Sequence, residues 1–205
     1  MPSDLYKQIK TCNDTFGIER EKTERKPMDY KAIIDKYYPE DSKLKKLLLK
    51  HSRCVADKAL QIADRHPELN ADRAFLEEAA MLHDIGVCRT DAPGIECFGT
   101  EPYIRHGIIG AEMMRNEGYP RHARVCERHT GTGITRQAIE ERQLPLPAAD
   151  YLPETIEEQM VCYADKFFSK SHPERVRTVE QTAQSLAKFG EDGVRKFMQW
   201  AEMFE

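Results

Sequence analysis

The sequence predicts an all-α protein, and three observations support that prediction. From Met28 onward, apolar residues recur at spacings of three and four nearly everywhere, as they do on the buried face of a helix. Few stretches combine β-branched residues with strict apolar and polar alternation, so no strands are expected. Proline, glycine and helix-capping residues divide the pattern into segments of helical length.

The helix boundaries follow from these signals in chain order. A helix over residues 28–38 stops before Pro39, and Asp41 or Ser42 caps the next one, which ends at His66. Further helices are predicted over residues 71–84, 103–118, 121–129, 135–143, 153–170, 173–189 and 191–204.

Between the third and fourth helices lies a segment with little periodicity, residues 88–102, which contains two prolines and two glycines. A loop of this length is unusual in a compact domain, so we expect it to be a functional lid. Residues 1–27 are polar and charged, and we interpret them as an extension. Residues 28–205 are then a single helical domain.

Composition narrows the classes of partner. The net charge of −4 provides no electrostatic attraction for a nucleic-acid polymer or an anionic membrane, so neither is expected. The N-terminus lacks the apolar core of a signal peptide, and no apolar run approaches the roughly 20 residues of a membrane span, which predicts a cytoplasmic protein. None of the six cysteines forms a CxxC pair. The oligomeric state is not readable.

Several predicted helices carry a histidine or an aspartate, residue types that bind metals, on the face that should point inward. These residues are His51, His83, His106, His129 and Asp165. Convergent helices that present histidine and carboxylate to one centre are how metal sites in helical bundles are made. A buried ionised carboxylate is also costly unless it is paired or metal-bound, so Asp84 and Asp165 need such a partner.

The types of these residues indicate the kind of metal. Imidazole and carboxylate without thiolate suit a divalent transition metal, namely iron, manganese, zinc or nickel, rather than a structural zinc site. Adjacent residues on an ideal helix point about 100° apart and do not readily share one ion. Gly86 provides a helix end just after His83 and Asp84, where that geometry relaxes.

These residues resemble a known family. His51, His83, Asp84 and Asp165, in this order, match the H…HD…D signature of the HD-domain metal-dependent phosphohydrolases. The chain is similar to small HDIG proteins of archaea and anaerobic bacteria, over core motifs at residues 48–170. The resemblance implies an HD-domain helical bundle.

The runs RHGIIGAEMM and ERHTGTGIT, which contain His106 and His129, look like the additional motifs of dinuclear members of that family. The resemblance implies that His51, His83, Asp84 and Asp165 hold a first metal. It also implies that Asp84 bridges to a second metal, which His106 and His129 complete. One or two metals per chain are expected, with Asp84 and His83 as catalytic residues and a metal-activated hydroxide as nucleophile.

The resemblance further implies hydrolysis of a phosphate ester or anhydride in a small phosphorylated substrate, such as a nucleotide. Four cations near the motifs are candidates for binding its phosphate: Arg53, Lys58, Arg89 and Arg105. Two other functions remain open. The same ligands would serve a di-iron oxygenase, and a non-catalytic sensor would bind a nucleotide without turnover.

Overall fold

The computed structural model describes residues 28–170 and 175–205; the predicted extension, residues 1–27, lies outside the described residues. Nine α-helices make up most of the described chain, which confirms the all-α class. They are α2 (Tyr30–Tyr37), α3 (Lys43–Arg65), α4 (Arg73–Leu82), α5 (His106–Asn116), α6 (Pro120–Arg128), α7 (Arg136–Glu141), α8 (Ile156–Asp165), α9 (Val179–Ala187) and α10 (Glu191–Phe204).

Side-chain caps fix where several helices begin. The Ser42 side chain accepts a hydrogen bond from the Lys45 amide, so Ser42 rather than Asp41 is the N-cap of α3. Thr155 and Glu158 form a capping box at the start of α8. Such caps satisfy amide groups that have no partner within the helix, and each contributes about 1 kcal/mol.

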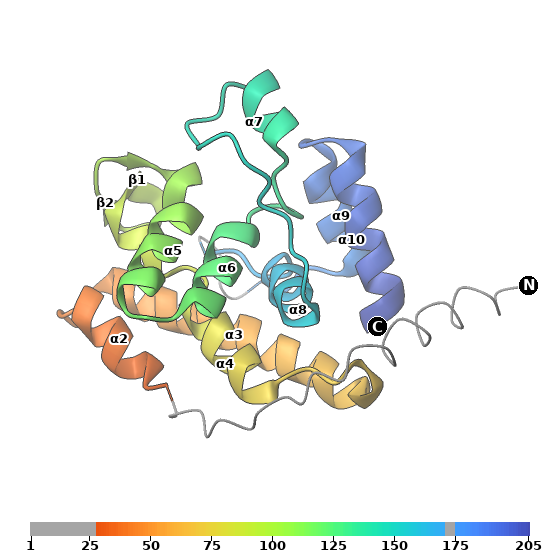
Figure 1. Ribbon diagram of the computed structural model, residues 1–205, viewed down its shortest axis with the longest axis horizontal. Coiled ribbons are helices and arrows are strands. Elements are labelled where there is room, and N and C mark those ends of the chain that lie inside the picture. The colour runs from red at the N-terminus through yellow and green to blue at the C-terminus, as the bar shows by residue number, and fades with distance from the viewer. Residues whose placement is uncertain (1–27, 171–174) are drawn as a thin grey trace, which may run out of the picture.

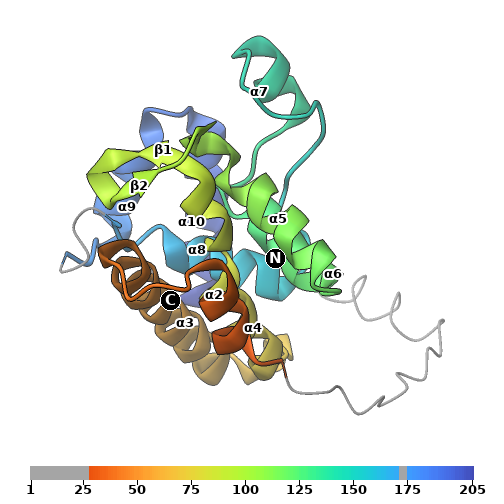
Figure 2. The same ribbon diagram turned by 90° about the vertical axis from the view of Figure 1, so that its left-hand side faces the viewer.

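The helices pack in a few close pairs (Figure 1). Helix α3 lies against α4 and α8, α5 lies against α6, and α10 lies against α9 and α8. Helix α7 stands apart from the other helices in both views (Figures 1 and 2). One cluster of buried apolar side chains extends from Met28 to Phe204, so the described residues share a main core.

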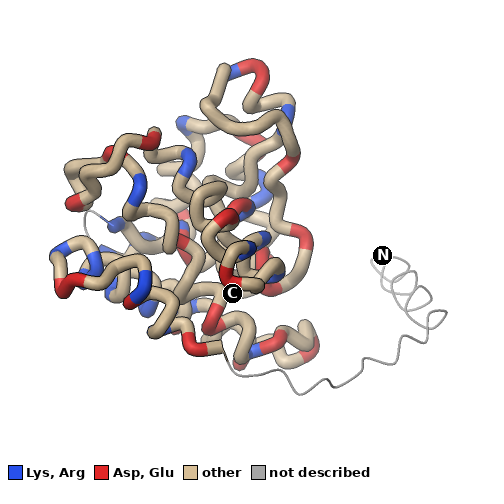
Figure 3. Tube along the Cα trace, turned by 60° about the vertical axis from the view of Figure 1, so that its left-hand side comes forward, with Lys and Arg blue, Asp and Glu red and all other residues tan. Residues whose placement is uncertain are grey.

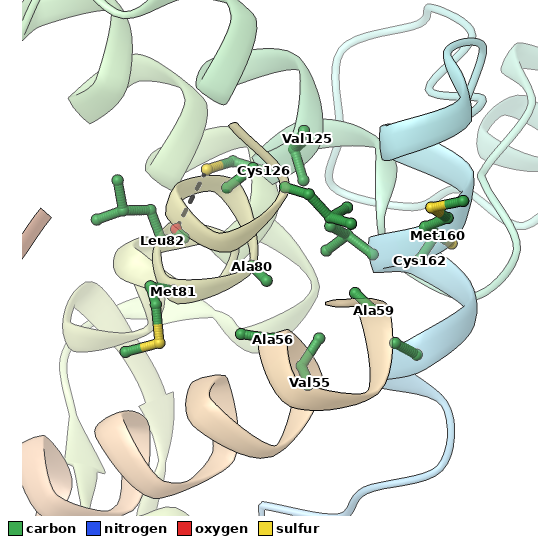
Figure 4. Packing of buried hydrophobic residues seen from close by; sticks show 14 of the residues in the cluster. Val55, Ala56, Ala59, Ala80, Met81, Leu82, Val125, Cys126, Met160 and Cys162 are labelled. Atoms are coloured by element: carbon green, nitrogen blue, oxygen red, sulfur yellow. Dashed lines mark hydrogen bonds between the residues drawn. The ribbon is translucent and has the colours of Figure 1, made fainter. Parts of the chain in front are cut away.

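Small side chains bring α3, α4, α6 and α8 close together (Figure 4). Ala59 on α3, Ala80 on α4 and Cys162 on α8 are fully buried. The Cys126 thiol of α6 donates to the Leu82 carbonyl oxygen at the end of α4, at 3.4 Å. Close packing of these four helices holds their ends, and the side chains on those ends, near one another.

The expectation that residues 88–102 form a loop without strands is wrong. The segment contains the strands β1 (Thr90–Ala92), β2 (Cys97–Phe98) and β3 (Glu101–Pro102). They form a sheet in the order β2-β1-β3, in which β1 is antiparallel to β2 and parallel to β3. Strands of two or three residues are too short to show an alternating pattern, which is why the sequence did not indicate them.

Some helices are shorter than predicted, and several of their ends coincide with candidate metal ligands. Helix α8 ends at Asp165 rather than near Lys170, and α4 ends at Leu82. Helix α5 begins at His106, after a 3₁₀ turn at Tyr103–Arg105. The candidate ligands therefore stand mainly at helix ends.

Acidic and basic residues are interspersed over the described chain (Figure 3). Among the described residues, no helix is both long enough and apolar enough to cross a membrane.

Candidate metal centre

Four of the predicted ligands meet in the interior. His51, His83, Asp84 and Asp165 each offer a ligand atom, and these atoms lie within 4.8 Å of one another. The Nε2 atom of His51 lies 3.2 Å from Asp84 Oδ2 and 2.9 Å from Asp165 Oδ1. The Nε2 atom of His83 lies 3.1 Å and 3.5 Å from the same two oxygens. All four side chains are buried.

A second group shares Asp84 with the first and adds His106 and His129. The two imidazole Nε2 atoms lie 3.0 Å apart. They lie 3.5 Å and 3.3 Å, respectively, from Asp84 Oδ1. One oxygen of Asp84 therefore faces the first group and the other faces the second, so all six predicted ligands come together around a single carboxylate.

Backbone carbonyls orient three of the imidazoles in the same way. The Nδ1 atoms of His83, His106 and His129 lie 2.6–2.7 Å from the carbonyl oxygens of Ala80, Tyr103 and Cys126, each three residues earlier in the chain. A carbonyl can only accept, so each Nδ1 donates its proton. In the neutral ring, Nε2 then carries the lone pair, which is the arrangement that metal-binding histidines commonly adopt.

The residues present fit a divalent metal. The buried ring nitrogen His51 Nδ1 has no partner among the described residues, and the Nε2 atoms of His51 and His83 lie at ion-pair distance from the Asp84 and Asp165 carboxylates without a well-aligned hydrogen bond. Neither oxygen of Asp84 has one either, although Oδ2 is ion-paired. Buried polar atoms left in this way are costly, and coordination to a cation removes the cost.

The donor set also indicates which metals suit the site. No cysteine belongs to either group of potential ligands in the described chain. Cys126 and Cys162 lie nearby, but burial raises the pKa of both thiols, and both donate to backbone carbonyls instead. Imidazole and carboxylate remain, which is the chemistry of iron, manganese, zinc or nickel sites.

The charges of the cluster suit a cation. Burial opposes the charged form of His83, but Asp84 and Asp165 lie so close that they raise the pKa of His83 to about 9. Burial lowers the pKa of His106 to about 3, so this ring is neutral. Despite their burial, the pKa values of Asp84 and Asp165 stay well below the usual range because of the neighbouring histidines and lysines.

The C-terminal ends of helices also favour a cation at this centre. His83 and His129 cap the C-terminal ends of α4 and α6, and Asp165 is the last residue of α8. The C-terminal end of a helix carries a partial negative charge, which favours a cation within about a turn. Three helix C-termini therefore lie at this centre, two through their capping residues and one through its last residue.

Two lysines at the centre were not predicted. Lys166 Nζ lies 2.6 Å from Asp165 Oδ2 and 2.8 Å from the His129 carbonyl oxygen. Lys170 Nζ lies 2.7 Å from Asp84 Oδ2. Both follow Asp165 beyond the end of α8, where helical periodicity no longer indicates which way a side chain points. Only their nearness to Asp165 in the sequence could have indicated that these two lysines lie at the centre.

Three of the four cations predicted to bind phosphate pair with other residues. Arg53 pairs with Asp57 and Glu77. Lys58 pairs with Glu205.

The other two cations differ from each other. Arg105 pairs with Glu101 and donates to the Pro145 carbonyl oxygen, while the Arg89 side chain is exposed. Among the described residues, no ion pair or hydrogen bond joins any of the four to the six clustered histidines and aspartates.

Comparison with known proteins finds similar chains in other organisms. The chain is 36% identical over 153 residues to a tRNA (cytidine(56)-2'-O)-methyltransferase of Picrophilus torridus and 35% identical over 169 residues to one of Thermoplasma volcanium. These alignments cover 70% and 82% of this chain but only 40% of each relative. An uncharacterized protein of Methanocaldococcus jannaschii is 37% identical over 121 residues, which are 58% of this chain and 64% of that protein.

No solved structure gives a significant match. The family model of the HD domain matches residues 48–169, more than half of the chain, and this span contains all six of the clustered histidines and aspartates. The chain therefore belongs to the HD domain family.

Proposed function

We propose that the protein is a metal-dependent hydrolase of a phosphate ester or anhydride, acting on a small phosphorylated metabolite such as a nucleotide. The observation that carries the proposal is the position of Asp84. Its Oδ2 faces His51 and His83 while its Oδ1 faces His106 and His129, so two groups of potential ligands share one carboxylate. Paired sites of this kind suit displacement at phosphorus. Membership of the HD domain family, a superfamily of mostly metal-dependent hydrolases, supports the same reaction.

In this proposal His51, His83, Asp84 and Asp165 hold one divalent metal. Asp84 also contributes to a second, weaker site with His106 and His129. When bound, a divalent metal supplies a hydroxide at neutral pH, by lowering the pKa of a bound water to about 7, and it polarises a phosphoryl oxygen.

The side chains perform the remaining tasks. Asp84 stays ionised, because its pKa is held well below the usual range, and so supplies negative charge to both sites. The carbonyls of Ala80, Tyr103 and Cys126 hold the rings of three histidines with Nε2 directed at the centre. Rotation of these rings is therefore not needed before reaction, which lowers the cost of organising the site.

The names of two relatives describe methyl transfer to tRNA, a different reaction. We base the proposal on the site because this chain spans only 40% of those proteins. Charge supports a small substrate rather than a nucleic-acid polymer. The net charge is −4, and acidic and basic residues are interspersed over the described chain (Figure 3).

The test is metal analysis of the purified protein, followed by turnover of a panel of phosphate esters and nucleotides with the metal found. We expect phosphate release by the wild type and by Asp192→Asn, an exposed carboxylate on α10, but not by Asp84→Asn.

Three outcomes would overturn the proposal. Oxygen consumption by iron-loaded protein without phosphate release would indicate the di-iron oxygenase. Tight nucleotide binding without product would indicate the sensor. Methyl transfer to tRNA without phosphate release would indicate the reaction named for the relatives.

A further inference from the structure

A cavity of about 370 Å³ lies between the segment that contains the small sheet and the segment that follows α8. Its lining residues are Ala92, Gly94, Ile95, Tyr103, Phe168, Ser169, Lys170 and Arg177. Its volume is near the lower end of the range of roughly 300–1,000 Å³ found for ligand pockets. Such a space suits a small metabolite rather than a polymer.

The inner wall of the cavity touches the candidate metal centre at two points. Lys170 lines the cavity, and its Nζ lies 2.7 Å from Asp84 Oδ2. Tyr103 lines the cavity too, and its ring stacks on His106 with centroids 4.7 Å apart. A molecule in the cavity therefore lies next to residues that contact Asp84 and His106, the carboxylate and one imidazole of the second group.

The lining has two chemical parts. Lys170 and Arg177 are cationic, and no carboxylate is among the lining residues in the described chain. The Arg177 guanidinium donates to the Lys166 carbonyl oxygen at 3.3 Å and has no ion pair with the described residues, so its charge is not neutralised there. The rest of the wall includes apolar side chains, among them Ile95 and the half-buried Phe168.

We propose that this cavity binds the substrate of the metal centre, and that the substrate is a small phosphate ester with a compact, partly apolar organic group. Lys170 and Arg177 bind the phosphate through charge-assisted hydrogen bonds, while Ile95 and Phe168 contact the organic group. The inference rests on the proposed function and extends it, since it assigns phosphate recognition to Lys170 and Arg177 in place of the four cations predicted from the sequence.

Calorimetric titration of the full chain with its purified metal tests the assignment. The probes are inorganic phosphate and phenylphosphonate, whose carbon–phosphorus bond resists hydrolysis. A hydrogen bond to a charged group accounts for about tenfold in affinity, so Arg177→Met should weaken both probes by about that factor. Phe168→Ala should weaken phenylphosphonate alone. Arg195→Met, which removes an exposed cation on α10, is the matched control and should bind both probes as the wild type does.

Lys170→Met is the second phosphate variant, and its metal content is measured as well because Lys170 also pairs with Asp84. Unchanged phosphate affinity in Arg177→Met, with the fold intact by circular dichroism, would overturn the inference. If Arg177→Met also hydrolyses esters with the wild-type KM, the binding inference fails while the proposed hydrolase function still holds. If the probes bind as expected but no ester is hydrolysed, the binding assignment stands and the proposed function fails.

Discussion

The substitution Gly86→Ala tests how closely the fold and the candidate site depend on each other. A Cβ atom at Gly86 would lie 2.2 Å from the His106 carbonyl oxygen and 2.4 Å from the Gly110 amide nitrogen, both on the backbone of α5. A backbone cannot rotate away as a side chain can, so α5 must shift by roughly 1 Å to reach ordinary contact distances. Overpacking costs about 1–3 kcal/mol, and a backbone clash belongs at the upper end of that range.

For a chain of this size, each kcal/mol corresponds to about 2–4 °C in Tm, so we expect a Tm lower by about 6–12 °C. The shift also reaches the site, because His106 is the first residue of α5. Its Nε2 lies 3.5 Å from Asp84 Oδ1. Movement of α5 therefore separates His106 from Asp84, and we expect the second metal site to lose occupancy.

The assay is thermal unfolding of the metal-free protein, followed by metal analysis of the loaded protein. The matched control is Gly193→Ala within α10, where the new Cβ would lie 3.2 Å from Thr132 Oγ1, a side-chain atom that can rotate away. Alanine is favoured over glycine in a helix interior by about 0.5–1 kcal/mol, so this control should be neutral or slightly stabilising. A Tm for Gly86→Ala within about 2 °C of the wild type would refute the reasoning.

Three further predictions concern the metal centre. Asp84→Asn should reduce turnover to below about a tenth of the wild-type rate with helical content intact; a higher rate would mean that less than about 1.4 kcal/mol of the barrier depends on this carboxylate. His106→Ala should lower the metal content of saturated protein from two ions per chain toward one; a single ion in both proteins would assign His106 and His129 to substrate phosphate instead. Metal binding at pH 7.5 should release a proton from His83, whose pKa in the metal-free protein is raised to about 9, because a ligand imidazole must be neutral. The number of protons released per chain should fall by about one as the pH rises above about 9, since His83 is then already neutral, and calorimetry in buffers of different ionisation enthalpy measures this number; no such fall would contradict the prediction.

The sequence was sufficient for the fold class, the family and the six clustered residues. The spacing of apolar residues at three and four positions indicates which side of a helix is buried, and a capping residue such as Ser42 indicates where the helix starts, because both signals are local. A family signature matched four residues in their order along the chain: His51, His83, Asp84 and Asp165. Such a signature indicates that residues far apart in the sequence meet in the fold, which apolar periodicity cannot indicate.

Tertiary structure alone separated residues that look alike in the sequence. His122 and His129 share a face of α6, yet only His129 reaches Asp84. His122 is buried beside Glu78, with the imidazole Nε2 and the carboxylate Oε2 3.2 Å apart, and its ring packs against Phe75. Seven residues of helix span about 10 Å, so two inward-facing histidines at that spacing meet different surroundings.

Sequence periodicity also failed to indicate the positions of Lys170 and Arg177 and the presence of the small sheet. The predicted helices over residues 153–170 and 173–189 include Lys170 and Arg177, but both residues lie outside helices in the structure, so the helical period does not indicate where their side chains point. The strands at residues 90–102 are two or three residues long, too short to show a period. Local sequence determines which face of an element is apolar and where the element ends. Packing between elements far apart in the chain determines which ends meet, and therefore which cations line the cavity beside the candidate metal centre.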